Sequence, residues 1–291
     1  MAKFLWTQRS NFGPGPRTDH AMTFDSQRGR TVLFGGLGSS GDAILADTWE
    51  WDGSFWTQMD DVGPGPRAEH AMVYDSARQA SILFGGRRPA NPDAPDSPDF
   101  WDTWQWDGEA WTQLANSGPS PRSGHGMAFD SGRNRTVLFG GQPSSLVDTW
   151  EFDGQDWTQQ ADTGPPDARS HPMAFDSTGA RVLLFDSRSV TTWSWNGASW
   201  VQIAASGPPA RDITAMTAAA GPIVLFGGRT FSAQFGDSWS FDGTHWTQVQ
   251  DIGPGPRGSH ALTFDSTRGA IVLFGGLDAN ATLGDTWEHI T

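Results

Sequence analysis

The chain repeats one long pattern, and this repetition constrains its fold more than any other feature. The stretch GPGPRTDHAMTFDSQRGRTVLFGG begins at Gly13, and close copies begin at Gly63, Gly118 and Gly253. Each copy continues into a phrase built on DTW, and the first three then continue into a second tryptophan phrase. A fixed internal period predicts a repeat architecture in which each unit buries its faces against its neighbours.

Each unit contains four phrases, and all four have the composition of strands. In the first unit they read HAMTFD, RTVLFGG, DTWEWD and SFWTQ, with turn residues between them. Short runs of β-branched and aromatic residues bounded by Gly, Pro, Asp and Ser favour strands, and no segment has a helical period. An Asx-Gly pair joins the third and fourth phrases in five units, which predicts a hairpin with positive φ at both turn residues.

The DTW phrase predicts six units, the last of which is incomplete. Its tryptophan recurs as Trp49, Trp104, Trp150, Trp193, Trp239 and Trp287. The sixth unit ends without a fourth strand, whereas FLWTQ, with Trp6, stands at the N-terminus. We therefore expect six four-stranded antiparallel sheets arranged radially, with the N-terminal strand completing the last sheet and closing the ring. The predicted units of this single domain, 1–291, are 13–58, 63–113, 118–159, 164–202, 207–248 and 253–291 plus 3–8.

The glycine and tryptophan spacing resembles that of kelch repeats. Five units keep a glycine pair after a buried strand: Gly35-Gly36, Gly85-Gly86, Gly140-Gly141, Gly227-Gly228 and Gly275-Gly276. The resemblance covers essentially the whole chain and implies an all-β fold, a six-bladed kelch β-propeller. It does not identify a function, because one fold supports many functions.

Composition excludes several classes of function. A net charge of −14 argues against a nucleic-acid partner and an anionic membrane surface. The absence of cysteine removes disulfides, thiolate metal sites and cysteine nucleophiles. Kelch copper oxidases need a tyrosine–cysteine cofactor, which a chain with Tyr74 as its only tyrosine and no cysteine does not form. With no signal peptide or membrane span in the sequence, we expect a soluble cytoplasmic monomer without a cofactor or metal.

Chain direction predicts which end of the ring is variable. In an up-and-down sheet, the loops between second and third strands share one end with the links between units. These loops differ in length and chemistry, and the longest covers 87–101. Variation on one end of a rigid scaffold predicts a binding surface. Its candidate residues are Arg87, Arg88, Trp101, Asp186, Arg188 and Arg229.

Two features of this end have alternative interpretations. The longest loop folds over the channel as a lid, or it is a solvated excursion. The arginines form an anion-binding patch, or they are scattered and solvated.

A histidine begins the first strand of five units, and an arginine precedes it. If the first strand is innermost, as in kelch propellers, these side chains lie near the channel mouth. A residue repeated in every unit favours a structural joint between blades over a ligand, metal or catalytic role, because catalysis needs distinct groups. In the fourth unit the arginine, Arg169, is one place out of register. The candidate ligand-binding residues are Arg17, His20, Arg67, His70, Arg122, His125, His171, Arg211, Arg257 and His260.

The fourth and fifth units depart from the repeat. Thr214 replaces the histidine of unit five, Asp186-Ser187 replaces the glycine pair of unit four, and Thr191 replaces its aspartate. The two units are neighbours on the predicted ring, so the departures indicate either a ligand contact or repeat drift. On the ligand hypothesis, changes at Asp186 and Arg188 impair activity more than changes at Arg28 and Arg30.

The sequence leaves three functional hypotheses open. The first is a non-enzymatic binding scaffold that presents its variable loops and channel mouth to a protein, peptide or small ligand. The second is a small-molecule enzyme, a lyase, isomerase or cyclase, with an Arg/His-lined pocket at the mouth. The third, weaker one is a carbohydrate-binding propeller, in which exposed tryptophan stacks on sugars. A deep, closed polar pocket favours the enzyme, and a broad open rim favours the scaffold.

Overall fold

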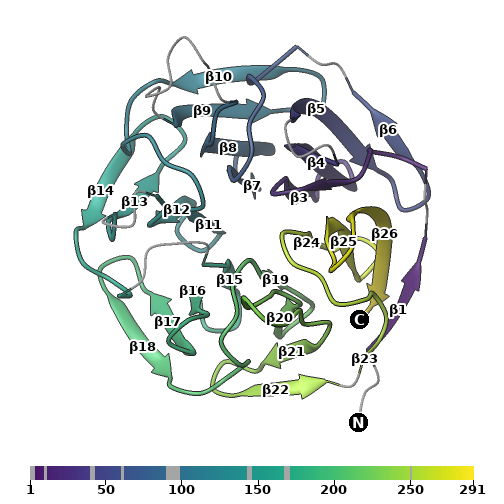
Figure 1. Ribbon diagram of the computed structural model, residues 1–291. Helices are drawn as coiled ribbons and strands as arrows, with labels where there is room; N and C mark the ends of the chain where they lie inside the picture. Colours follow the sequence, from purple (N-terminus) through teal and green to yellow (C-terminus); the bar gives the residue numbers. More distant parts are fainter. Residues whose placement is uncertain are drawn as a thin grey trace.

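Six β-sheets form a ring around a central channel in the computed structural model (Figure 1). The structure describes residues 4–9, 12–39, 43–59, 62–89, 99–142, 146–166, 171–249 and 251–291. Throughout these ranges the regular elements are strands, with no helix. Each blade contains four main antiparallel strands, and the short strands β2 (Arg17–Thr18) and β23 (Asp251–Ile252) extend the first and last sheets.

The blades follow one another in chain order, and the first strand of each lies nearest the channel. Blade 1 contains β3 (Ala21–Asp25), β4 (Arg30–Gly38), β5 (Ile44–Trp51) and β6 (Trp56–Gln58). Blade 2 contains β7 (Ala71–Asp75), β8 (Ala80–Gly86), β9 (Phe100–Trp106) and β10 (Trp111–Ala115). Blade 3 contains β11 (Gly126–Asp130), β12 (Arg135–Phe139), β13 (Thr149–Phe152) and β14 (Trp157–Ala161).

The second half of the ring repeats this order. Blade 4 contains β15 (Met173–Asp176), β16 (Arg181–Asp186), β17 (Thr191–Trp195) and β18 (Trp200–Ala204). Blade 5 contains β19 (Ala215–Ala218), β20 (Ile223–Phe226), β21 (Ser238–Phe241) and β22 (Trp246–Val249). Blade 6 contains β24 (Ala261–Asp265), β25 (Ala270–Leu277), β26 (Thr282–Ile290) and, from the other end of the chain, β1 (Phe4–Gln8).

The N-terminal strand closes the ring. β1 pairs antiparallel with β26, with Trp6 opposite His289 and Gln8 opposite Trp287, and β23 pairs with its other edge. The first and last strands along the chain, β1 and β26, therefore lie in the same blade (Figure 1). The predicted all-β, six-bladed propeller, including its closure by the first strand, is confirmed.

The turn between third and fourth strands differs from the predicted hairpin. In blade 1, Trp51 pairs with Trp56, so the turn comprises the four residues 52–55. The carboxylate of Asp52 accepts hydrogen bonds from the backbone N–H groups of Ser54 and Phe55, each at 2.8 Å. Only Gly53 takes a positive φ, 96°. The expectation of two positive φ values is wrong because the aspartate shapes the turn through its side chain.

The hydrophobic core lies between the blades. Met72 of blade 2, for example, packs with Val32 and Phe34 of blade 1. Five fourth-strand tryptophans also donate their indole N–H to a threonine of the preceding blade, at 2.8–2.9 Å. These pairs are Trp56–Thr286, Trp111–Thr48, Trp157–Thr103, Trp200–Thr149 and Trp246–Thr192. Each such seam therefore combines apolar burial with one satisfied buried N–H.

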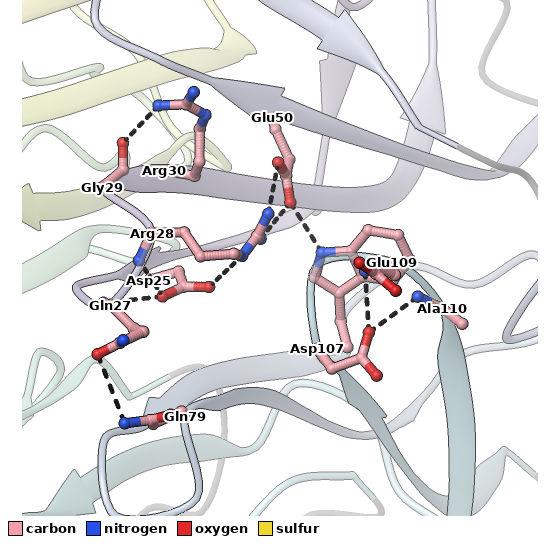
Figure 2. Close-up of polar contacts among 11 residues, drawn as sticks. Asp25, Gln27, Arg28, Gly29, Arg30, Glu50, Gln79, Asp107, Glu109 and Ala110 are labelled. Atoms are coloured by element: carbon pink, nitrogen blue, oxygen red, sulfur yellow. Dashed lines mark hydrogen bonds and ion pairs between the residues drawn. The ribbon is translucent and has the colours of Figure 1, made fainter.

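An ion-pair network joins blades at the end of the ring that carries the turns between first and second strands. Arg28 lies between Asp25 and Glu50, as Figure 2 shows, and contacts both carboxylates. Glu50 also accepts a hydrogen bond from the indole N–H of Trp106, in the next blade, at 2.9 Å. The guanidinium of Arg28 approaches Gly108 so closely that a Cβ there would clash with it. Glycine at this turn therefore allows the positive φ of the backbone, 101°, and also leaves room for the guanidinium of Arg28 between the blades.

Candidate functional site

The repeated histidines line a cavity at the end of the channel that bears the variable loops. We call this end the loop face; it carries the connections between second and third strands and the links between blades. The cavity has a volume of about 180 Å³. Its lining includes Thr214 in the place of a sixth histidine, together with His20, His70, His125, His171 and His260.

Backbone hydrogen bonds around the mouth join the residues just before four of these histidines and before Thr214. The N–H of Glu69 donates to the carbonyl of Asp19 at 2.9 Å, and that of Gly124 donates to Glu69 at 2.8 Å. In the same way Asp19 donates to Ser259, and Ser259 donates to Ile213, at 3.1 and 3.0 Å. All five residues have φ between 49° and 62°, which is unfavourable for the β-branched Ile213. A strained backbone persists only where the surrounding structure enforces it, so these hydrogen bonds hold the mouth in one conformation.

Four of the five histidines pack against a phenylalanine of the preceding blade. The imidazole of His70 meets the ring of Phe34 edge-on, with 5.5 Å between centroids. A Cβ on Gly35 would lie 3.2 Å from Cε1 of His70, and Gly35 has a φ of 62°. The first glycine of the pair therefore makes room for the imidazole of the next blade. The same contact recurs at Phe84–His125, Phe226–His260 and Phe274–His20.

Burial keeps these imidazoles neutral at pH 7. Loss of solvation, and then the nearby arginine of the same blade, lower the pKa of His125 and of His260 to about 3. The same two causes hold the pKa of His20 and of His70 well below 6.5. The backbone carbonyl of Phe84 offsets part of the shift at His125. An imidazole with so low a pKa is a poor proton acceptor and donor at neutral pH.

The five arginines that accompany the histidines are paired within their own blades. Both terminal nitrogens of Arg122 donate to the carboxylate of Asp148, at 2.7 and 2.9 Å, and one also donates to the carbonyl of Gly140 at 2.9 Å. The guanidinium is fully buried, while Asp148 is partly exposed. The same pairs occur at Arg17–Asp47, Arg67–Asp102, Arg211–Asp237 and Arg257–Asp285. Arg169, the expected counterpart in blade 4, lies outside the described residues.

The aspartates of these pairs are the residues that the sequence analysis missed. Asp148 also accepts the indole N–H of Trp150 at 2.6 Å, which explains why the repeat reads D-T-W. Burial alone would raise the pKa of Asp148, but hydrogen bonds from Arg122 and Trp150 hold it below its ordinary value. A signal was present in the sequence, because unit four has Thr191 in place of the aspartate and also lacks an arginine in register.

The departures from the repeat in blades 4 and 5 depend on each other structurally. Blade 5 has Thr214 in place of histidine, and its hydroxyl donates to the carbonyl of Phe226 in its own blade at 2.8 Å. Blade 4, which precedes it, therefore has no imidazole to accommodate and carries Asp186 where other blades carry glycine. Asp186 is buried and accepts the backbone N–H groups of Arg188 and Ser189, at 3.1 and 3.2 Å. A glycine and a histidine have thus been lost together.

Comparison with known proteins agrees with this architecture. The family profile described as the KLHDC2/KLHL20/DRC7 Kelch-repeats domain matches residues 2–185. The chain belongs to this kelch-repeat family. A solved structure titled "Structure of YjhT" is similar over 94% of this chain and 95% of its own, with a TM-score of 0.72 and 14% sequence identity, which shows a common fold. Among curated proteins, none matches the chain.

On this kelch propeller the candidate loop residues fall into two groups. In blade 2, Arg87 pairs with Glu69 at 3.4 Å, Arg88 stacks on a phenylalanine, and Trp101 donates its indole N–H to a backbone carbonyl at 2.9 Å. In blades 4 and 5, Arg188 pairs with Asp212 at 3.0 Å, and Asp212 exchanges two backbone hydrogen bonds with Arg229.

Part of the longest loop, residues 90–98, lies outside the described residues, so the lid interpretation remains a prediction. In the described ranges, no group of three or more His, Asp or Glu side chains is arranged to hold a metal ion. No helix in those ranges is long and apolar enough to cross a membrane.

Proposed function

We propose that this kelch propeller is a non-enzymatic scaffold that binds a protein, peptide or small ligand on its loop face. The observation that carries this proposal is the use of the repeated residues at the mouth. The five arginines are paired with aspartates, and the histidines are packed against neighbouring blades. What remains free to differ between blades is the set of loops on the same face.

The geometry gives less support to the alternative of an enzyme with an Arg/His-lined pocket. The mouth cavity is small, about 180 Å³, compared with roughly 300 Å³ and more for typical ligand pockets. Burial lowers the pKa of four of its imidazoles, those of His20, His70, His125 and His260, so these are neutral at pH 7. The five repeated arginines are not among its described lining residues and already have carboxylate partners. The channel below it is lined mainly by methionine, phenylalanine, small aliphatic and hydroxyl side chains, with Tyr74 its one titratable group among the described lining residues. Such a lining does not supply an acid and a base in distinct roles.

Two exposed phenylalanines allow a matched test. Phe231 is fully exposed in the loop between β20 and β21, on the loop face, and Phe55 is exposed in a turn at the opposite end of the ring. A photo-crosslinking residue at each position, in separate full-length proteins, is exposed to extract from the source cells. We expect a saturable crosslinked product from position 231 and none from position 55.

Substitution of each phenylalanine then distinguishes a specific contact from non-specific hydrophobic binding. Phe231→Ser is expected to reduce co-purification of the crosslinked species at least several-fold, whereas Phe55→Ser leaves it unchanged. Equal effects of the two substitutions, or products only from position 55, would contradict the proposal. Turnover of a small molecule that is lost on substitution of a mouth histidine, in a protein that stays folded, would favour the enzyme.

A further inference from the structure

A second cavity lies on the loop face, and all of its described lining residues belong to blade 2. It has a volume of about 260 Å³, and these residues are Arg88, Phe100, Trp101, Asp102 and Asn116. Trp101 is 37% exposed, and its indole N–H donates to the backbone carbonyl of Asn116 at 2.9 Å. This hydrogen bond fixes the indole and leaves a flat apolar surface beside the cavity. The cavity lies outside the ring of mouth histidines and shares none of their side chains.

Two arginines sandwich the aromatic ring at the base of this cavity. The guanidinium carbons of Arg67 and Arg88 each lie 3.9 Å from the ring centroid of Phe100. Two cations at this height cannot share one face of the ring, so Phe100 lies between them. Stacking on an aromatic face leaves the N–H groups at the edge of a guanidinium available to an acceptor.

Among the described residues of this pocket, the positive charge exceeds the negative charge. Asp102 accepts two hydrogen bonds from Arg67, at 2.7 and 3.0 Å, and a third from the indole of Trp104 at 2.8 Å. No carboxylate among the described residues pairs with Arg88, and its Nε is buried without a hydrogen-bond partner in that part of the chain. Within the described part of the pocket, the guanidinium groups of Arg67 and Arg88 therefore share one carboxylate, that of Asp102. A buried donor without an acceptor is costly, and an anionic ligand would relieve that cost.

From this arrangement we infer that the blade 2 pocket binds a small aryl carboxylate. The planar edge of Arg88 matches a carboxylate, and the indole of Trp101 and the ring of Phe100 provide apolar walls for a flat group. The nearby charge of Asp102 disfavours a dianion such as phosphate more than a monoanion. The volume suits one ring with its carboxylate and falls just below that of typical drug-sized pockets, roughly 300 Å³.

This inference rests on the proposed function, since it names one ligand class for the same loop face. It is tested on purified full-length protein without cell extract, so the two proposals fail separately. Benzoate is the probe, and its binding is followed by saturation-transfer NMR and titration calorimetry. We expect saturable binding of benzoate that weakens with salt, and no binding of benzamide, which has the ring without the charge.

Three variants assign the binding to this pocket. Arg88→Gln is expected to weaken benzoate binding about tenfold or more, and Arg88→Lys several-fold, because lysine keeps the charge without the planar fork. The matched control is Arg30→Gln, which changes a half-buried arginine at the opposite end of the ring that donates a hydrogen bond to the backbone carbonyl of Gly29. It is expected to leave binding unchanged. Thermal unfolding of each variant checks that the protein stays folded.

Three results would overturn the inference. The first is no saturable binding of benzoate to the folded wild-type protein. The second is equal binding to the wild-type protein and to Arg88→Gln. The third is binding of inorganic phosphate or a neutral sugar in preference to benzoate, which would assign the pocket to another class of ligand.

Discussion

At the scale of single residues, the repeated side chains work in complementary pairs. Arg122 needs Asp148, and the imidazole of His70 needs the space left by Gly35. Glutamate on a third strand accompanies tryptophan in the next blade, as in Glu50–Trp106, Glu151–Trp195 and Glu288–Trp51. Where the third strand has Gln105 or Ser194, the next blade has Phe152 or Phe241 instead. Both members of a pair change together because a buried polar group without its partner is destabilising.

The arginine–aspartate pair gives a prediction about stability. Asp148→Asn removes the charge that balances the buried guanidinium of Arg122, so we expect a loss of about 3–5 kcal/mol in the free energy of unfolding. The matched control is Asp156→Asn, an exposed aspartate of the same blade, with a change within about 0.5 kcal/mol. Urea unfolding measures both values. Similar small losses in the two variants would show that the pair is not a structural joint.

The positions of single residues could be predicted from the repeat, but their partners could not. The histidines lie at the mouth, and the repeat indicated that position because it located them at the start of an inner strand. The aspartate counterpart of each arginine, such as Asp148 for Arg122, was missed because the pairing crosses a sheet between residues 26 apart in sequence. The pocket of blade 2 could not be predicted from the sequence either, because it depends on how Arg88 stacks on Phe100 in the folded chain.

At the scale of elements, the closure of the ring depends on β1. Trp6 is buried at the seam against Phe226, Leu262 and Leu273, and β1 covers the edge of β26. The other blades are closed by strands that directly follow in the chain. The sequence predicted this arrangement because the last unit lacked a fourth strand and the first residues supplied one. It did not predict β23, because a two-residue parallel pairing leaves no pattern in the sequence.

Removal of β1 is expected to open the seam. Deletion of residues 1–9 exposes the apolar pocket of Trp6, and burial of one such tryptophan is worth about 3–5 kcal/mol, so the unfolding temperature falls by several degrees or more. A synthetic peptide of residues 1–12 added to the deleted protein restores part of that loss. Deletion of residues 1–3 alone is the control. An unchanged unfolding temperature after the longer deletion would contradict closure by β1.

At the scale of the whole molecule, the buried histidines make the propeller sensitive to acid. The unfolded chain takes up a proton at each histidine below about pH 6.5, whereas the folded chain keeps His125 and His260 neutral until about pH 3. Stability from these groups is therefore present above pH 6.5 and is lost as the pH falls toward 3. Across this window, each of the two histidines lowers the free energy of unfolding by about 1.4 kcal/mol for every unit that the pH falls.

Acid unfolding measures this loss directly. The pKa values of His20 and His70 are also shifted downward, so these two residues add to the loss, and we expect the protein to unfold before the pH reaches about 3. Circular dichroism follows the transition. The variant His125→Gln removes one titrating group and should flatten the pH dependence of the free energy by about 1.4 kcal/mol per pH unit. A folded state that persists unchanged to pH 3 would refute the prediction.

We propose that the repeated histidines hold neighbouring blades together and do no acid–base chemistry. NMR titration of their side-chain carbon and nitrogen signals between pH 8 and the onset of acid unfolding tests this claim directly. We predict that His125 and His260 remain neutral throughout, because burial lowers the pKa of each to about 3. A folded protein in which these imidazoles titrate between pH 6 and 7 would contradict it and would make the mouth cavity a candidate for catalysis.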